Sequence, residues 1–143
     1  LLDILLLTGI PDELVLMGDN FESDPIIYLS LTSLLKETQD PWQLWNYLRK
    51  LEAFQMNRKQ NSILLNKVYQ ISNLLSARTE KGKGYPEIKI FIRKKVDETS
   101  IEMPESLNQH SSHIELYEGL PPSLAIKESQ KLKSKEALEQ KKE

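Results

Sequence analysis

The chain of 143 residues contains no cysteine and almost no net charge, with 19 basic residues against 21 acidic ones. The absence of cysteine excludes disulfide bonds, thiolate metal sites and a cysteine nucleophile. The balanced charge provides no overall attraction to nucleic acid or to an anionic membrane. We therefore expect no nucleic-acid partner and a cytoplasmic location, with secretion as a bacterial effector as the open alternative.

Long hydrophobic runs are missing as well. The apolar stretch at residues 1–7 (LLDILLL) is interrupted by Asp3 and is far too short to cross a bilayer. It has neither a basic leader nor a small-residue cleavage site, so it does not resemble a signal peptide. We expect no transmembrane segment. The stretch instead indicates the last turns of a buried helix closed by Gly9, and hence a fragment of a longer protein.

The most informative segment that is present, residues 18–24 (GDNFESD), follows the apolar run 14–17. The run predicts a strand over residues 13–18 that is covered on both faces, as in a parallel sheet. A helix over residues 24–36 should follow, with Asp24 as its N-cap and Pro25 at its first position. Carboxylates at the carboxyl end of a strand lie where open α/β folds place their ligand sites.

Asp19 and Asp24 are therefore the candidate metal ligands. Carboxylate oxygens suit Mg²⁺, which often takes one or two carboxylates and completes its shell with water and substrate phosphate. Gly18 is expected to ease close packing at the strand end, Asn20 to tolerate the turn, and Glu22 to be solvated. The alternative is a polar turn followed by a helix cap. No nucleophile partner is visible, so we assign no catalytic residue to this chain.

Two helices without an intervening strand follow the acidic loop. Asp40 and Pro41 repeat the cap-then-proline signal, and the second helix spans about residues 57–76. Together they predict a helical hairpin at about residues 40–76. Trp42 and Trp45 are expected to pack this hairpin against the sheet, although a ligand pocket is a second interpretation.

The remaining apolar residues predict two further strands. Alternation over residues 88–92 predicts a strand whose second face is exposed, which suggests a sheet edge. A short strand is expected at residues 114–117, after a polar stretch at 97–112 that resembles a loop. Residues 126–143 contain mainly Lys, Glu, Gln, Ser and Ala and predict a frayed helix or a disordered tail.

Two weaker patterns deserve a chemical interpretation. His110 and His113 could form a metal pair, but they have no third ligand nearby, so a structural role is favoured. Arg78, Lys81 and Lys83 surround two glycines and could hold a phosphate, but the spacing is not that of a phosphate-binding loop. We interpret that segment as an ordinary solvated connection.

These motifs resemble a known family. Gly18-Asp19 with Asp24 resembles the last acidic motif of the haloacid dehalogenase superfamily of phosphohydrolases. The segment 24–28 (DPIIY) is similar to the Asp-Pro-x-Ile-Tyr of the branch that includes actin-patch phosphatidate phosphatases. The strands expected at residues 90–93 and 114–117 agree with that branch in order and spacing. The helix at residues 1–7 would match the helix before its acidic motif.

The resemblance implies a partial Rossmann-like α/β fold, a three-layer sandwich of the haloacid dehalogenase type with an inserted helical hairpin. Residues 1–122 would be the carboxyl-terminal portion of that domain and residues 123–143 the charged tail. It also implies Mg²⁺ as cofactor, a phosphorylated substrate of unknown identity, and a missing amino-terminal half. That half should carry the Asp-x-Asp nucleophile strand, the Ser/Thr motif and the lysine, none of which occurs here.

The leading hypothesis is a Mg²⁺-dependent phosphohydrolase fragment that is inactive alone, in which Asp19 binds the metal and Asp24 supports it. A second hypothesis is a non-catalytic interaction module that uses the hairpin at residues 40–76 as its binding surface. A third is a degenerate or truncated protein without activity of its own.

Overall fold

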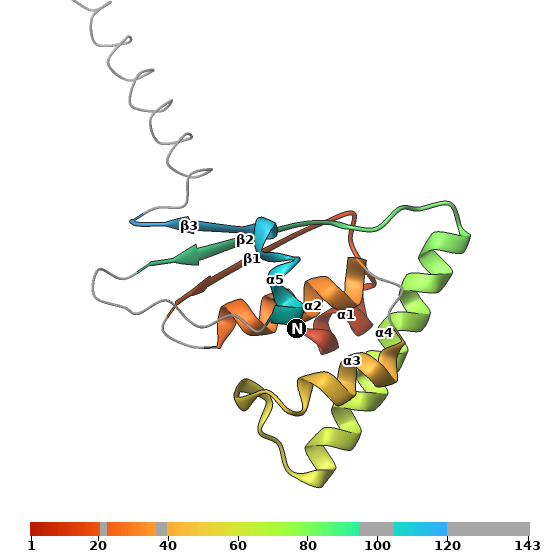
Figure 1. Ribbon diagram of the computed structural model, residues 1–143. Helices are drawn as coiled ribbons and strands as arrows, with labels where there is room; N and C mark the ends of the chain where they lie inside the picture. Colours follow the sequence, from red (N-terminus) through yellow and green to blue (C-terminus); the bar gives the residue numbers. More distant parts are fainter. Residues whose placement is uncertain (21–22, 37–39, 95–104, 120–143) are drawn as a thin grey trace, which may run out of the picture.

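The computed structural model describes residues 1–20, 23–36, 40–94 and 105–119 (Figure 1). The three strands form one parallel sheet in the order β1-β2-β3, which confirms the mixed α/β class. In chain order the elements are α1 (Leu2–Thr8), β1 (Glu13–Asp19), α2 (Asp24–Lys36), α3 (Pro41–Leu48), the 3₁₀ turn η1 (Glu52–Phe54), α4 (Arg58–Glu80), β2 (Glu87–Arg93), α5 (Glu105–Asn108), the 3₁₀ turn η2 (Ser111–His113) and β3 (Ile114–Tyr117).

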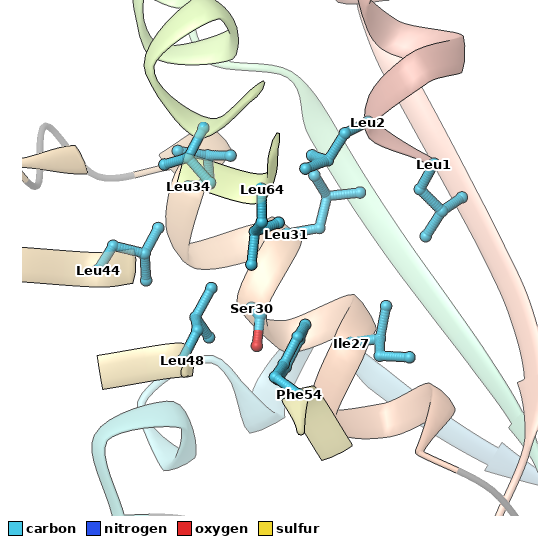
Figure 2. A pocket seen from close by; sticks show the side chains of 11 residues that line it. Leu1, Leu2, Ile27, Ser30, Leu31, Leu34, Leu44, Leu48, Phe54 and Leu64 are labelled. Atoms are coloured by element: carbon cyan, nitrogen blue, oxygen red, sulfur yellow. The ribbon is translucent and has the colours of Figure 1, made fainter. Parts of the chain in front are cut away.

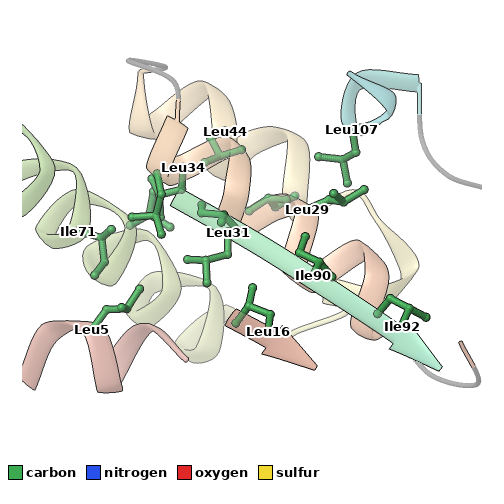
Figure 3. Close-up of a cluster of buried hydrophobic side chains, with 14 residues drawn as sticks. Leu5, Leu16, Leu29, Leu31, Leu34, Leu44, Ile71, Ile90, Ile92 and Leu107 are labelled. Atoms are coloured by element: carbon green, nitrogen blue, oxygen red, sulfur yellow. The ribbon is translucent and has the colours of Figure 1, made fainter. Parts of the chain in front are cut away.

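The core lies between the sheet and the helices, on one face of the sheet. In Figure 1 the labelled helices gather on that side, and Figure 3 shows their side chains meeting the strands. Ile90 and Ile92 of β2 are fully buried there against Leu29 of α2 and Leu107 of α5. Each strand therefore contributes alternate residues to this core, as the pleat of a strand requires.

The second face of β1 is open, which corrects the expectation of a strand covered on both faces. Val15 and Met17 are 48% and 47% exposed, whereas Leu16 between them is 5% exposed. The four ranges that the structure describes place helices on one face of the sheet only, so they form two layers and not three. A continuous apolar run does not distinguish these two arrangements.

The strand β2 is the central strand and not an edge, which is a second correction. Its alternation is partial, because Ile88, Ile90 and Ile92 are buried and Lys89 is exposed, whereas Phe91 on the second face is only 7% exposed. The exposed residues lie on the open face of the sheet. Period-two alternation reports which face is solvated and does not indicate how many neighbours a strand has.

The predicted hairpin is present, and α4 continues four residues beyond the expected end at Ser76, to Glu80. Asp40 caps α3 by accepting a hydrogen bond from the Trp42 amide (3.1 Å). Asn57 and Gln60 form a capping box at the start of α4, with both bonds at 3.0 Å. These caps fix the two helix starts that the sequence pattern predicted.

The amino-terminal helix α1 is less buried than predicted. Only Leu5 is buried, whereas Ile4 and Leu7 are 59% and 86% exposed. Gly9 follows the helix with φ 79°, a value that glycine adopts without strain, and its amide bonds the Leu5 carbonyl (2.9 Å). The predicted glycine end of the helix is therefore confirmed, while the expected burial is wrong.

The polar stretch at residues 97–112 contains more structure than the predicted loop. Residues 105–108 form α5 and residues 111–113 form η2, and Leu107 and His110 are 1% and 6% exposed. Glu22, residues 95–104 and the predicted tail lie outside the described residues. No helix in the described ranges has both the length and the apolar composition that crossing a bilayer requires.

Candidate functional site

The carboxyl end of β1 carries the predicted acidic loop, and Asp24 reaches back to it. The first bond of α2 runs from the Ile27 amide to the Ser23 carbonyl (2.9 Å), so Ser23 occupies the cap position. The predicted N-cap role of Asp24 is therefore wrong. Its Oδ2 instead accepts a hydrogen bond from the Asp19 amide (3.3 Å). The carboxylate thus joins the start of α2 to the end of β1.

Gly18 makes this approach possible, as predicted. A Cβ placed on Gly18 would lie 2.8 Å from both Cβ and Cγ of Asp24 and would overlap its Oδ2. Real Cβ atoms essentially never show such contacts, so a side chain at position 18 would push the Asp24 carboxylate away from the strand. Close approach to Asp24 explains the need for glycine, since Gly18 does not have a positive φ.

Tyr28 also belongs to the site, and the sequence analysis did not predict its contact with β1. It lies one helical turn after Asp24, and its hydroxyl donates a hydrogen bond to the Met17 carbonyl (2.8 Å). Burial raises the pKa of the Tyr28 hydroxyl, and the Asp24 and Asp19 carboxylates raise that pKa further. Its i, i+4 spacing from Asp24 was the available signal, but the sequence alone did not reveal its acceptor.

Asp19 points away from Asp24. Residues paired across parallel strands share a face, so Asp19 lies in one row with Arg93 and Tyr117 on the open face. The Arg93 guanidinium is 3.8 Å from Asp19 Oδ2, and the two side chains are 52% and 29% exposed. Such an exposed and long ion pair is weak, because water and salt screen it. The structure therefore brings both aspartates to one strand end but gives their carboxylates different partners.

Asn20 extends the sheet by one bond. Its amide donates to the Arg93 carbonyl (3.1 Å), so the ladder between β1 and β2 continues beyond Asp19. Among the described residues no position other than glycine has a positive φ. The left-handed turn geometry that asparagine tolerates is therefore not used at Asn20.

The donor set is compatible with Mg²⁺ but does not form a complete cage. Each carboxylate offers about four lone-pair sites, so the bond to the Asp19 amide leaves acceptor capacity on Asp24. Within the described residues, no group of three or more His, Asp or Glu side chains is placed to hold a metal. Mg²⁺ commonly keeps several waters and substrate oxygens, so a Mg²⁺ site needs as few as one or two protein carboxylates.

Arg78, which we considered for phosphate binding, instead joins two loops at the opposite end of the sheet, the α1–β1 loop and the α4–β2 loop. Its guanidinium donates to the Ile10 carbonyl (2.9 Å), the Gly84 carbonyl (2.8 Å) and Asp12 Oδ1 (2.7 Å). The Arg78 side chain is only 10% exposed. Hydrogen bonding and charge attraction from Arg78 lower the pKa of Asp12, and the Lys83 charge lowers it further. This arginine is a structural clamp at the amino ends of β1 and β2.

The two histidines lie beside the sheet. His113 Nδ1 is 3.1 Å from the Ile88 carbonyl, and the two imidazole centroids are 6.3 Å apart. An Nδ1–H donated to that carbonyl is the arrangement that satisfies both groups. His113 therefore anchors η2 to β2.

The two tryptophans were predicted to pack the hairpin against the sheet, but Trp45 is buried against α4 and Trp42 is half exposed. Trp45 is 7% exposed and its Nε1 donates to the Asn61 carbonyl of α4 (3.2 Å). Trp42 is 49% exposed and lies against Trp45, with ring centroids 4.8 Å apart. Trp45 thus joins α3 to α4, and the sheet is not its partner.

An apolar cavity of about 60 Å³ separates α2 from the hairpin (Figure 2). Leu31, Leu48 and Phe54 help to line it, and the hydroxyl of Ser30, its polar lining residue, donates to the Ile26 carbonyl (2.6 Å). A water molecule needs two to four polar partners, which this lining does not offer. The cavity is a dry packing gap and provides no group that would orient a charged substrate.

Comparison of the chain with protein-family models, with curated proteins and with solved structures found no match.

Proposed function

We propose that this chain is the carboxyl-terminal portion of a Mg²⁺-dependent phosphohydrolase related to the haloacid dehalogenase superfamily. The observation that supports the proposal best is that Asp19 and Asp24 both lie at the carboxyl end of β1, next to a glycine whose missing side chain makes room for Asp24. Ligand sites in open parallel sheets lie at this end of the strands.

In this proposal Asp19 is the direct Mg²⁺ ligand, and Asp24 is a second ligand or holds a metal-bound water. A bound Mg²⁺ would neutralise a phosphoryl group and orient it for in-line attack. The nucleophile is expected in the missing amino-terminal half, on a strand ending in Asp-x-Asp. The 143-residue chain should therefore show no turnover of phosphate esters by itself. The substrate is proposed only as a phosphorylated compound.

The test is a phosphatase assay on the protein that includes the upstream sequence. Asp19→Ala should lower kcat/KM by at least about 100-fold, and Asp24→Asn by about 10- to 100-fold, because ligands and the groups that orient them control metal affinity. Asp12→Asn is the matched control at the other end of β1 and should leave activity within about twofold. Survival of activity and of Mg²⁺ dependence in both site variants would contradict the proposal.

The second candidate function is a non-catalytic interaction module. It is favoured by exposed apolar side chains on the hairpin, since Trp42 is 49%, Ile63 45% and Leu74 37% exposed. Ile63 and Leu74 are separated by about three turns of α4 and so share one side of that helix. If Mg²⁺ has no effect on the stability of the intact protein, and Asp19→Ala has no effect on its activity, this candidate becomes the better one.

A further inference from the structure

The backbone of the sheet holds Arg93 beside Asp19. The two residues are paired in the register of β1 and β2, and the Asn20 amide donates to the Arg93 carbonyl (3.1 Å). On the other side of β2, the Lys94 amide donates to the Tyr117 carbonyl (2.9 Å). Neighbouring strands are about 4.8 Å apart, and paired residues share a face of the sheet. The ladder therefore sets the position of Arg93 next to the proposed metal ligand.

The Arg93 side chain contributes little to holding the fold together. Its Nη2 atom lies 3.8 Å from Asp19 Oδ2, whereas a charge-assisted hydrogen bond between nitrogen and oxygen measures about 2.7–2.9 Å. Among the residues that the structure describes, the guanidinium has no closer anionic partner. A guanidinium has five N–H donors, so this one long contact leaves most of them for another anion.

Arg78, at the other end of the sheet, shows how an arginine that holds the fold differs from Arg93. The Arg78 side chain is 10% exposed and donates three hydrogen bonds of 2.7–2.9 Å, whereas the Arg93 side chain is 52% exposed. Arg93 also lies at the carboxyl ends of the strands, where open parallel sheets have their ligand sites. Its position and its hydrogen bonding thus make Arg93 the arginine that is available to a ligand.

A phosphoryl group is the ligand whose chemistry fits Arg93. The planar guanidinium offers two parallel N–H groups that match two oxygens of a phosphate. When Asp19 binds Mg²⁺, its neutralised carboxylate no longer attracts Arg93, and the divalent charge repels the guanidinium. Arg93 therefore competes with Mg²⁺ for Asp19, and it becomes free to bind an anion that is held by the metal.

We propose that Arg93 binds the phosphoryl group of the substrate. In the metal-free chain its guanidinium pairs with Asp19, and when Asp19 binds Mg²⁺ the guanidinium donates to the phosphoryl oxygens instead. The inference rests on the proposed phosphohydrolase function and adds a phosphate-binding residue to it. The role belongs to a cation at the carboxyl end of β2, and not to the basic segment around Arg78.

The main test measures inhibition by inorganic phosphate, a competitive probe of the phosphoryl site, in the protein that includes the upstream sequence. With Mg²⁺ present, Arg93→Gln should raise the inhibition constant about 10- to 100-fold, because a hydrogen bond to a charged group contributes that much. Arg93→Lys keeps the charge but loses the planar fork, so its inhibition constant should lie between those of the unaltered protein and Arg93→Gln. An unchanged inhibition constant in Arg93→Gln would overturn the inference.

Mg²⁺ binding in the absence of phosphate should change in the opposite direction. Arg93→Gln removes the cation that competes for Asp19, so the dissociation constant for Mg²⁺, measured by calorimetry, should fall about two- to fivefold, as expected for an exposed ion pair. Replacing an arginine with a purely structural role would weaken the binding of both ligands. Replacing one that serves only as the counter-ion of Asp19 would leave phosphate binding unchanged. Either result would contradict the proposal.

Two further variants separate this inference from the proposed function. Lys94→Gln removes the same charge from the next residue, whose side chain lies on the other face by strand alternation, and should leave both constants within about twofold. Asp19→Ala tests the phosphohydrolase proposal itself. If Asp19→Ala abolishes activity while Arg93→Gln binds phosphate normally, only this inference fails. If Asp19→Ala is fully active, both fail.

The unaltered protein offers a test that needs no substitution. In nuclear magnetic resonance spectra, the side-chain Nε–H signal of Arg93 should shift when inorganic phosphate is added together with Mg²⁺. The shift should be smaller when phosphate is added alone, because Arg93 then remains paired with Asp19. A signal that does not respond to phosphate and Mg²⁺ together would rule out the proposed contact.

Discussion

The two ends of β1 are held by opposite chemistry. At the amino end, the Arg78 guanidinium from α4 donates three hydrogen bonds, two to carbonyls and one to Asp12. At the carboxyl end, Asp24 and Tyr28 from α2 bind an amide and a carbonyl of the strand itself. A helix thus fastens each end, with a cation at one and with a carboxylate and a phenol at the other.

The ion pairs at the two ends differ as well. At the amino end Arg78 pairs with Asp12, and Lys89 lies 2.8 Å from Glu13 and 3.2 Å from Glu87. At the carboxyl end the Arg93 guanidinium is 3.8 Å from Asp19, a longer ion pair that water and salt screen. The amino end is therefore held by the shorter ion pairs.

The largest expected effect is at the amino end. Arg78→Ala removes three bonds from a side chain that is 10% exposed and leaves two carbonyls without their donor. We expect the free energy of unfolding to fall by about 3 kcal/mol, since hydrogen bonds to charged groups contribute about 1.5–3 kcal/mol each and are not additive. Urea unfolding measures this loss, with Lys81→Ala as the exposed control. If the two variants were equally stable, the hydrogen bonds of Arg78 would not stabilise the amino end of β1.

At the carboxyl end, Gly18→Ala should have the next largest effect. The new Cβ would lie 2.8 Å from the Asp24 Cβ and Cγ, and overpacking of this kind costs about 1–3 kcal/mol. Gly84→Ala is the matched control, because a Cβ there meets nothing within 4 Å and its φ is not positive. It should be neutral or stabilising by up to about 1 kcal/mol. Thermal unfolding of both variants decides whether Asp24 packs against the strand.

A pair of tyrosine substitutions isolates the Tyr28 bond. Tyr28→Phe loses the hydrogen bond to the Met17 carbonyl and should lower the free energy of unfolding by about 1 kcal/mol. Tyr47→Phe removes a buried hydroxyl that has no partner in the described structure, so it should be neutral or stabilising. Guanidinium unfolding of the two variants gives the difference directly. If Tyr47→Phe lowered the free energy of unfolding more than Tyr28→Phe does, this expectation would be wrong.

The smallest expected effect is the pH dependence of the Arg78–Asp12 pair. Arg78 lowers the pKa of Asp12 in the folded chain, so the pair stabilises the fold above the unfolded pKa of about 4. That contribution is lost as the pH falls through the folded pKa. Asp12→Asn should therefore be less stable than the unaltered chain near pH 7, and the difference should shrink below about pH 4. Because Asp12 is exposed, added salt should reduce the difference too.

Local sequence signals account for most of the elements. Asp40, Pro41 and Asn57 are recognisable caps, and alternation marked the core residues of β2 from Ile88 to Ile92. The position of Asp24 beside the end of the strand that carries Asp19 was also predictable, because a strand, a short loop and a helix bring them close within six residues. The sequence did not predict that the Asp19 carboxylate points away. Contacts between residues only a few positions apart depend mainly on the local backbone conformation.

Contacts between distant segments could not be predicted in the same way. Arg78 bonds Ile10, which lies 68 positions away, and nothing in the local pattern distinguishes it from a solvated arginine. The open face of β1 was missed because Val15 and Met17 are apolar and yet half exposed. Whether an apolar side chain is covered depends on the elements that pack against it.

The order of residues alone determined most of the helices and strands and placed both aspartates at one strand end, because capping, turn chemistry and hydrophobic periodicity act over a few residues. Only the tertiary structure decided that β2 is central, that Val15 and Met17 of β1 lie on an open face and that Arg78 joins two distant loops. Those features depend on burial and backbone hydrogen bonding between elements that are distant in the chain, and such contacts form only when the sheet and its helices pack together.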